Sequence, residues 1–184
     1  MMVGREHVDK MDIAVLSTGG TIEKTYDAHR GTLHNQESVL DHILAELIIE
    51  NVALHRLHVM SKDSLDMTEE DQAEIARIAI EESRRRDGVI IVHGTDRLAE
   101  TGERIHQAGP PNAPIVLTGA MRPWVMRNSD AYQNITESLM AVQLLEPAVY
   151  VCMHSRVLAF PGVVKDRERL RFMSSDEAAG LKDR

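Results

Sequence analysis

The sequence is poor in several residue types on which whole classes of protein depend. It has one cysteine, Cys152, which excludes an intramolecular disulfide. No stretch approaches the ~20 apolar residues of a membrane span, and the first ten residues lack the apolar core of a signal peptide. Aromatic residues are 3% of the chain, which has 10 methionines, so an aliphatic, methionine-rich core is expected. We therefore expect a cytoplasmic protein without membrane contact.

Basic residues are fewer than acidic residues. The chain has 21 Lys and Arg against 29 Asp and Glu, a net charge of -8 at pH 7. Because affinity for nucleic acid rests on clustered Lys and Arg, nucleic acid is not an expected partner. The one basic cluster, Arg84 to Arg86, stands where its charges complement the carbonyl end of a predicted helix.

Strands and helices alternate along the chain, as is typical of a parallel sheet covered on both faces. We predict a single domain over residues 1–184, with no second domain. Its fold class is α/β, a three-layer, open, mostly parallel sheet with helices on both faces, of the Rossmann or flavodoxin type. Strands are expected at 11–17, 53–60, 88–93, 113–117 and 148–154, with 156–164 as an antiparallel or edge strand. Helices are expected at 37–49, 68–86, 99–107 and 129–145, with a polar loop at 18–35 and a short helix and frayed end in the last twenty residues.

Polar loops follow four of these strands. They read TGGT at 18–21, KDSLD at 62–66, GTD at 94–96 and TGAMR at 118–122. Crossover connections between parallel strands bring such loops to one edge of the sheet, where ligands bind in open α/β folds. The sequence therefore predicts one polar site at that edge.

The TGGT loop favours acyl transfer over nucleotide binding. It lacks the spacing of GxGxxG or of a P-loop, whereas its glycines leave N–H groups free as oxyanion donors. A threonine hydroxyl needs a base, for which Lys165 and Tyr26 are candidates. Burial favours a neutral lysine and a neighbouring Asp96 favours the charged form, so both protonation states stay open. The structural alternatives are a tight turn with a helix-capping threonine and a solvated surface lysine.

Five ordered segments resemble the bacterial-type L-asparaginases: 17–27 (STGGTIEKTYD), 62–68 (KDSLDMT), 93–102 (HGTDRLAETG), 116–123 (VLTGAMRP) and 163–167 (VVKDR). TGGTI and HGTD are signatures of that family. The resemblance implies hydrolysis of the side-chain amide of asparagine in two steps, through an acyl-enzyme on a threonine, with release of ammonia. It implies no metal and no organic cofactor.

The resemblance also assigns catalytic roles by motif position. Thr21 matches the nucleophile, and Tyr26 matches the mobile-loop tyrosine that assists it. Thr95, Asp96 and Lys165 match a second catalytic triad, in which Thr95 positions or activates the attacking group.

Substrate-binding positions follow in the same way. Asp96 would hold the α-ammonium, Ser64 the α-carboxylate, and Gly20 would lie against the substrate. Leu65 stands where some relatives carry a polar, substrate-binding side chain, which weakens the expected recognition. Asp66 is expected to cap the following helix, with substrate contact as its alternative.

Two aromatic rings near the loops have simpler expected roles. His93 is expected to form hydrogen bonds within its loop rather than act as a base, and the nine histidines show no metal-ligand spacing. Trp124 either walls the pocket or forms an interface.

The resemblance covers the first domain of the common asparaginases but not their second, smaller domain. It implies a short, single-domain member that acts on a small amino-acid substrate as a homodimer or larger homo-oligomer. Two alternatives stay open. One is an amino-acid-binding module with little turnover, and the other is a subunit of a larger amidotransferase.

Overall fold

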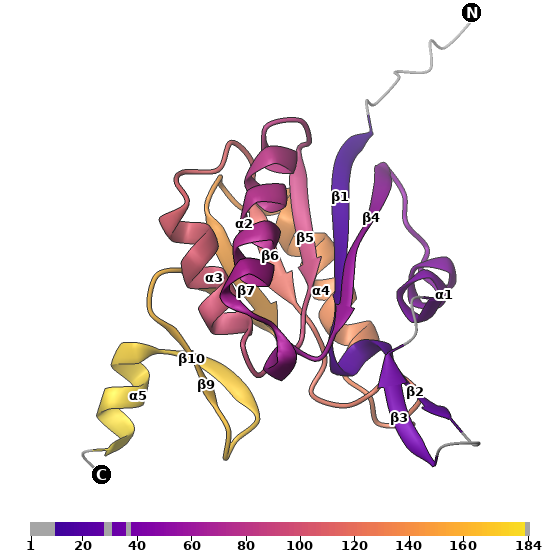
Figure 1. Cartoon of the computed structure of the whole chain (residues 1–184). Helices are drawn as coiled ribbons and strands as arrows, with labels where there is room; N and C mark the ends of the chain where they lie inside the picture. The colour runs from indigo at the N-terminus through magenta and orange to yellow at the C-terminus, as the bar shows by residue number, and fades with distance from the viewer. Residues whose placement is uncertain (1–9, 28–30, 36–37, 183–184) are drawn as a thin grey trace, which may run out of the picture.

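A six-stranded sheet forms the centre of the computed structural model, which describes residues 10–27, 31–35 and 38–182 (Figure 1). The strand order is β4-β1-β5-β6-β7-β8. The parallel strands are β1 (Met11–Gly19), β4 (Val52–Lys62), β5 (Gly88–Val92), β6 (Ile115–Thr118) and β7 (Val149–Met153), and β8 (Arg156–Ala159) runs antiparallel at one edge. Counting only the parallel strands, this is the 2-1-3-4-5 order of flavodoxin-like sheets. The predicted fold class is confirmed.

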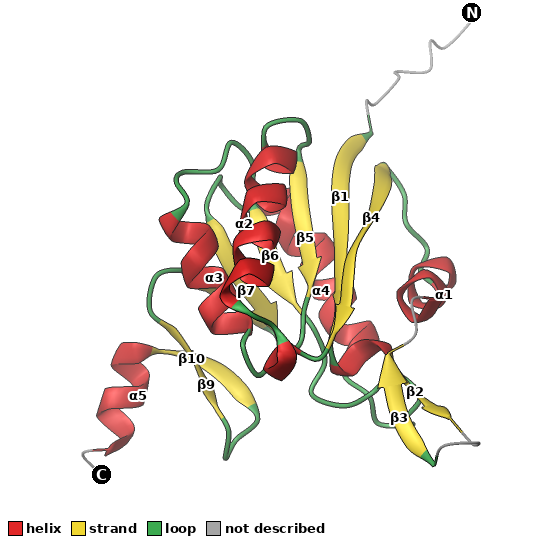
Figure 2. Ribbon diagram, viewed as in Figure 1, coloured by secondary structure: helices red, strands yellow, loops and turns green. Residues whose placement is uncertain are grey.

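Helices cover both faces of this sheet (Figure 2). One face carries α2 (Glu69–Ser83) and α3 (Leu98–Gln107), and the other carries α1 (Ser38–Glu46) and α4 (Ala131–Leu144). Alternate residues of β1 serve the two layers, since Ala14 and Leu16 pack on the α2–α3 side and Ile13 and Val15 on the α1–α4 side. A strand buried on both faces reads as a continuous apolar run, which is why its sequence predicted it.

Helix α2 begins at a capping box. The side chain of Thr68 accepts a hydrogen bond from the backbone N–H of Asp71, and Asp71 accepts one from the backbone N–H of Thr68. The predicted cap at Thr68 is confirmed, whereas Asp66 does not cap this helix: it ends the short helix η2 (Ser64–Asp66). Arg84 is the C-cap, so the helix ends before the arginine cluster rather than through it.

Two hairpins depart from the sequence prediction. The segment expected as a polar loop contains the short helix η1 (Thr21–Glu23) and an antiparallel pair, β2 (Lys24–Asp27) with β3 (Thr32–Asn35). The expected edge strand stops at Ala159, and the chain then forms a separate pair, β9 (Val163–Asp166) with β10 (Arg171–Ser174), followed by α5 (Ser175–Lys182). Both hairpins lie at the end of the molecule to which the parallel strands point (Figure 1).

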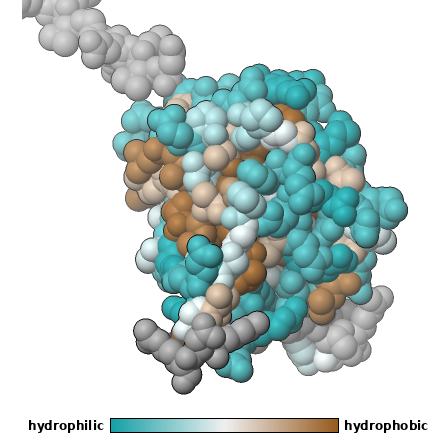
Figure 3. Space-filling view, turned by 90° about the vertical axis from the view of Figure 1, so that its left-hand side faces the viewer, coloured by the Kyte–Doolittle hydropathy of each residue, from teal (hydrophilic) through white to brown (hydrophobic). Residues whose placement is uncertain are grey.

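The surface on the side of α5 is mostly hydrophilic, with hydrophobic side chains gathered in separate patches (Figure 3). Scattered apolar exposure is normal for a folded protein. Within the described ranges, no helix is both long enough and apolar enough to cross a membrane.

Candidate functional site

Three glycines hold the four polar loops in contact at the carboxyl edge of the sheet. A Cβ on Gly20 would lie 2.4 Å from the Cα of Gly94, and a Cβ on Gly94 would lie 2.5 Å from the Oγ of Ser64. A Cβ on Gly119 would lie 2.3 Å from the carbonyl oxygen of His93. Gly20 also has φ +89°, a conformation that L side chains rarely adopt. The loops after β1, β4, β5 and β6 therefore meet, as their positions in the sequence predicted.

Lys165 reaches this edge from β9. Its Nζ donates a hydrogen bond of 2.8 Å to the Oγ1 of Thr95 and one of 3.0 Å to the Oδ1 of Asp96. The side chain of Lys165 is 11% exposed, and Thr95 is buried, with 4% of its surface exposed. Because Lys165 is seventy residues from Thr95 in the sequence, only the folding of β9 against α3 creates this cluster.

A second cation shares the Asp96 carboxylate. The Nη1 of Arg167 lies 2.9 Å from the same Oδ1 that Lys165 contacts, although the Arg167 side chain is 66% exposed. One oxygen of Asp96 is thus shared by two basic side chains. The sequence included Arg167 in the VVKDR segment without giving it a role.

Thr21 begins η1 directly after Gly20 and is half-buried. Thr21 and Thr95 thus each follow one of the two glycines whose backbones touch. The hydroxyl of Thr21 makes no hydrogen bond with another described residue. The loop of Thr21 therefore contacts the loop of Thr95, but Thr21 itself is not hydrogen-bonded to Lys165, Thr95 or Asp96.

Tyr26 lies on β2 and is 64% exposed. No hydrogen bond joins it to Thr21 or to Lys165 within the described ranges. Its hairpin is tied to the neighbouring loop instead, because Lys24 donates a hydrogen bond to Asp63. That bond lowers the pKa of the Asp63 carboxyl below its usual value.

Ser64 and Leu65 occupy the loop after β4 with opposite exposure. Ser64 is buried against Gly94, with 1% of its surface exposed, while Leu65 is 61% exposed. The carboxylate of Asp63 accepts a hydrogen bond from the backbone N–H of Leu65 and so fixes the start of η2. Asp66, the remaining acid of this loop, is exposed and makes no hydrogen bond through its side chain to any described residue.

His93 supports the loop that carries Thr95. It is fully buried, its Nδ1 lies 2.8 Å from the carbonyl oxygen of Gly94, and its Nε2 lies 3.0 Å from the hydroxyl of Thr101. A proton on Nδ1 satisfies the carbonyl, and the hydroxyl then donates to Nε2. Burial lowers the pKa of His93 to about 4, so the ring is neutral near pH 7. The predicted structural role of His93 is confirmed.

A polar network that the sequence did not indicate supports the loop after β6. Asp130 accepts hydrogen bonds of 3.0 Å from the backbone N–H groups of Met121 and Arg122, and one of 2.7 Å from the Nε2 of His154. Burial raises the pKa of Asp130, but these bonds outweigh it and lower the pKa below its usual value. Asn134 donates to the carbonyl oxygen of Gly119 at 2.9 Å. The position of Asp130 just before α4 was the only available signal, and it suggests a helix cap rather than a loop anchor.

The other residues noted in the sequence lie away from this cluster. Trp124 stacks on His42 with ring centroids 6.1 Å apart and packs against the α1–α4 core. Cys152 is buried, and burial raises the pKa of its thiol to about 11. No group of three or more His, Cys, Asp or Glu suited to a metal ion occurs in the described part of the chain.

Comparison with known proteins gives the family. The model of the N-terminal part of asparaginases matches residues 12–177. Among curated proteins, L-asparaginase of Thermococcus kodakarensis is 33% identical over 152 residues, which are 80% of this chain and 45% of that protein. A glutamyl-tRNA(Gln) amidotransferase subunit of Methanobrevibacter smithii is 33% identical over 147 residues, which are 79% of this chain and 34% of that protein.

Solved structures agree with this result. The thermostable L-asparaginase from Thermococcus kodakarensis has a TM-score of 0.78 at 29% identity, over 89% of this chain and 51% of that one. A probable cytoplasmic L-asparaginase from Campylobacter jejuni has a TM-score of 0.78 at 31% identity, over 91% of this chain and 54% of that one. The chain thus spans less than half the length of these curated relatives and about half the length of these solved chains. It belongs to the asparaginase family and covers that family's N-terminal domain.

Proposed function

We propose that this chain is an amidohydrolase that cleaves the side-chain amide of L-asparagine, or of a close ω-amide, through an ester on Thr21. The observation that carries the proposal is the hydrogen-bonded cluster of Lys165, Thr95 and Asp96, which lies at the contact between the loops of Thr21 and Thr95. A hydroxyl that is hydrogen-bonded to a largely buried lysine suits the proton transfers of acyl transfer.

In this mechanism the Oγ1 of Thr21 adds to the amide carbon, and its proton is passed to the leaving nitrogen, so that ammonia departs. Backbone N–H groups of the glycine loop would stabilise the oxyanion. That of Gly20 is not one of them, contrary to the expectation from the sequence, because it donates a hydrogen bond of 3.0 Å to the carbonyl oxygen of Lys62. In the second step, which requires Lys165 in its neutral form, water attacks the ester and its proton passes through Thr95 to Lys165. Lys165 then returns a proton to the departing Oγ1 of Thr21, which restores the hydroxyl, and the carboxylic acid product gives its proton to solvent.

Substrate recognition follows from the charges at the same edge. An α-amino acid zwitterion needs an anion for its ammonium and a donor for its carboxylate, which Asp96 and Ser64 supply. Gly20 gives the substrate close access to the backbone. Leu65 offers only an apolar contact, so affinity for the amino-acid part is expected to be modest.

Tyr26 is proposed to assist Thr21 when the β2–β3 hairpin closes over the substrate. In the structure it is exposed on a short hairpin, which suits a lid.

The decisive experiment measures ammonia release from millimolar L-asparagine and, separately, from L-glutamine by the purified chain. Thr21→Ala and Lys165→Met should each lower kcat by ~10²-fold or more. Arg127→Ala, which changes an exposed residue of the loop before α4, is the control. Full activity in Thr21→Ala would refute the mechanism.

A second candidate is a catalytic subunit of an amidotransferase. The observation in its favour is the match to the glutamyl-tRNA(Gln) amidotransferase of Methanobrevibacter smithii. In that case the chain alone would release no ammonia, and addition of a partner subunit would restore release. If asparagine or aspartate binds without any turnover under either condition, the chain is instead an amino-acid-binding module.

We further propose a cytoplasmic homodimer or larger homo-oligomer. The likeness to a probable cytoplasmic L-asparaginase supports the location. Light scattering that gave the mass of a single 20.6 kDa chain, together with full activity, would refute the oligomer.

A further inference from the structure

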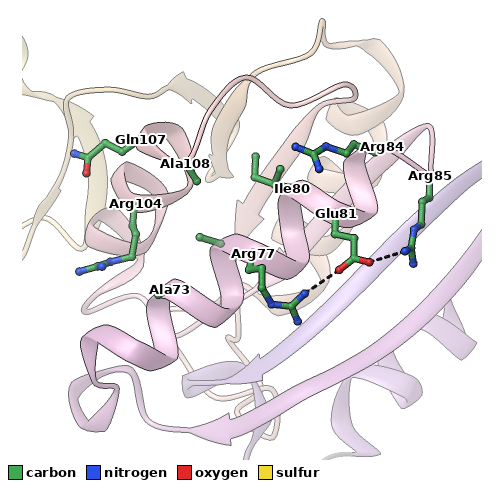
Figure 4. Close-up of a pocket in the computed structure, with 10 residues that line it drawn as sticks. Ala73, Arg77, Ile80, Glu81, Arg84, Arg85, Arg104, Gln107 and Ala108 are labelled. Atoms are coloured by element: carbon green, nitrogen blue, oxygen red, sulfur yellow. Dashed lines mark hydrogen bonds and ion pairs between the residues drawn. The ribbon is translucent and has the colours of Figure 1, made fainter.

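A groove of about 700 Å³ runs between α2 and α3, on the outer side of the helical layer (Figure 4). No residue of the four loops lines it, so it is separate from the proposed active site. We call it the α2–α3 groove and define it by Ala73, Ala76, Ile80 and Arg84 of the α2 side and by Arg104 and Ala108 of the α3 side.

The floor of the groove consists of small and apolar side chains. Ala73, Ala76 and Ile80 recur at three- and four-residue spacing along α2, and Ala108 faces them from the end of α3. From Ala73 to Arg84 the helix rises about 16 Å. The small side chains of Ala73 and Ala76, about one helical turn apart, allow the backbone of another helix to approach closely at that end of the groove.

The rim of the groove is basic, although the whole chain carries a net charge of -8. Four arginines line it, Arg77, Arg84, Arg85 and Arg104, against one acid, Glu81. Glu81 is already bound by Arg77 at 2.9 Å and by Arg85 at 2.5 Å. The one carboxylate of the groove is therefore paired with Arg77 and Arg85, and it leaves the charges of the other two arginines without a carboxylate partner inside the groove.

Arg84 and Arg104 carry that remaining charge. Arg84 is exposed, makes no ion pair or hydrogen bond with any residue in the described ranges, and extends over Ile80 toward α3 (Figure 4). Arg104 has only a long contact of 3.4 Å with Glu69. Complementing the helix dipoles accounts for basic residues at these helix ends. It does not account for an unpaired guanidinium lying over an apolar floor.

We propose that the α2–α3 groove binds an amphipathic helix of a partner protein, with a stripe of small apolar residues that meets the floor and acidic side chains that pair with Arg84 and Arg104. Helix-in-groove recognition uses this combination of an apolar stripe and flanking charges. Duplex nucleic acid fits poorly, because phosphates gain nothing from the apolar floor and only Arg84 and Arg104 keep charge to neutralise them.

The test uses a fluorescein-labelled helical peptide of ~15 residues, with Ala and Leu at i, i+3, i+4 and i+7 spacing and Glu on both flanks. Fluorescence anisotropy should show saturable binding that weakens as salt is raised. The double variant Arg84→Glu/Arg104→Glu should bind at least about tenfold more weakly. Ala73→Trp should also bind more weakly, because it fills the exposed end of the floor without changing charge.

The control is Arg127→Glu, which reverses one charge in the loop before α4, as each single substitution of the double variant does, and should bind as the wild type does. Amidase activity should be unchanged in all of these variants, which shows that they fold. Failure of the wild type to bind at ~100 µM peptide, equal binding of a Lys-flanked peptide, or unchanged binding by the double variant would each overturn the proposal.

Two further results would also overturn it by naming another occupant. If the charge reversals convert a dimer into a monomer in light scattering, the groove holds a second copy of this chain. If inorganic pyrophosphate displaces the peptide and binds the Ala73→Trp variant as well as the wild type, the groove is a small-anion site.

Discussion

Asp96 is the residue on which the proposed chemistry and the proposed recognition both depend. It binds Lys165 and Arg167 through one oxygen, Oδ1, while its Oδ2 makes no hydrogen bond within the described residues. Oδ2 is therefore the atom through which an α-ammonium would be held. The nearby positive charge of Arg167 opposes that ammonium.

We predict that Arg167→Ala lowers KM for L-asparagine by about two- to fivefold, the range expected for a charge interaction near solvent. Its kcat should change little, because Lys165 keeps its bond to Thr95. Steady-state kinetics beside Arg169→Ala, which removes an exposed arginine paired with Asp166 instead, would check this. A large fall in kcat would mean that Arg167 takes part in the chemical step.

Buried His93 makes a pH-dependent contribution to stability. Its pKa is about 4 in the folded chain, against 6.5 for the ordinary side chain, so the unfolded state binds its proton first as pH falls. The stabilisation is complete above pH ~6.5 and is lost progressively toward pH ~4, with about 2 kcal/mol lost by pH 5. In urea unfolding between pH 7.5 and pH 5, the free energy of unfolding should fall more steeply with pH for the wild type than for His93→Gln. Equal slopes would contradict the assignment.

Motif order predicted which residues meet, but not how they bond. Thr95, Asp96 and Lys165 were expected in one cluster, and they form it. The place of Arg167 on the same carboxylate depends on the path of β9 at the edge of the molecule, which local sequence does not specify. The position of Tyr26 relative to Thr21 likewise depends on a hairpin rather than on a motif.

Among the secondary-structure elements, those with apolar runs were predictable and the two hairpins were not. Central strands such as β1 and β5 are buried on both faces, so their sequences carry a strong signal. Strands β2 (KTYD) and β3 (TLHN) are four residues long and mostly polar, so no alternation distinguishes them from a loop. Strands β9 and β10 are also short, and their charged connection suggested a helix.

The contact between loops is set by Gly94. We predict that Gly94→Ala destabilises the chain by about 1–3 kcal/mol. The added Cβ would lie 2.5 Å from the Oγ of Ser64 and 2.6 Å from the Cβ of Ser64. Amidase activity should fall by about 10²-fold, since the two loops must separate. Gly180→Ala in α5, where no atom lies within 4 Å of the added Cβ, is the control. Wild-type activity in Gly94→Ala would show that the loop contact does not position the site.

For the molecule as a whole, the described residues hold a six-stranded sheet and the clustered site groups. The part of each of these solved relatives that the chain matches is about half of that relative. Binding and turnover are separate properties of such a site, because recognition of the amino-acid part does not require the chemical step.

The stabilisation of the folded chain by a bound ligand reports binding independently of turnover. A ligand that binds only the folded chain raises its stability by RT ln(1 + [L]/Kd), about 2.7 kcal/mol at a hundredfold excess over Kd. We predict that L-aspartate, the expected product, raises the midpoint of thermal unfolding of both the wild type and Thr21→Ala. Succinate should raise it less, because it lacks the ammonium that Asp96 would hold, and Asp96→Asn should abolish the difference between the two ligands. Equal shifts with aspartate and succinate in the wild type would refute α-ammonium recognition by Asp96, whatever the amidase assay shows.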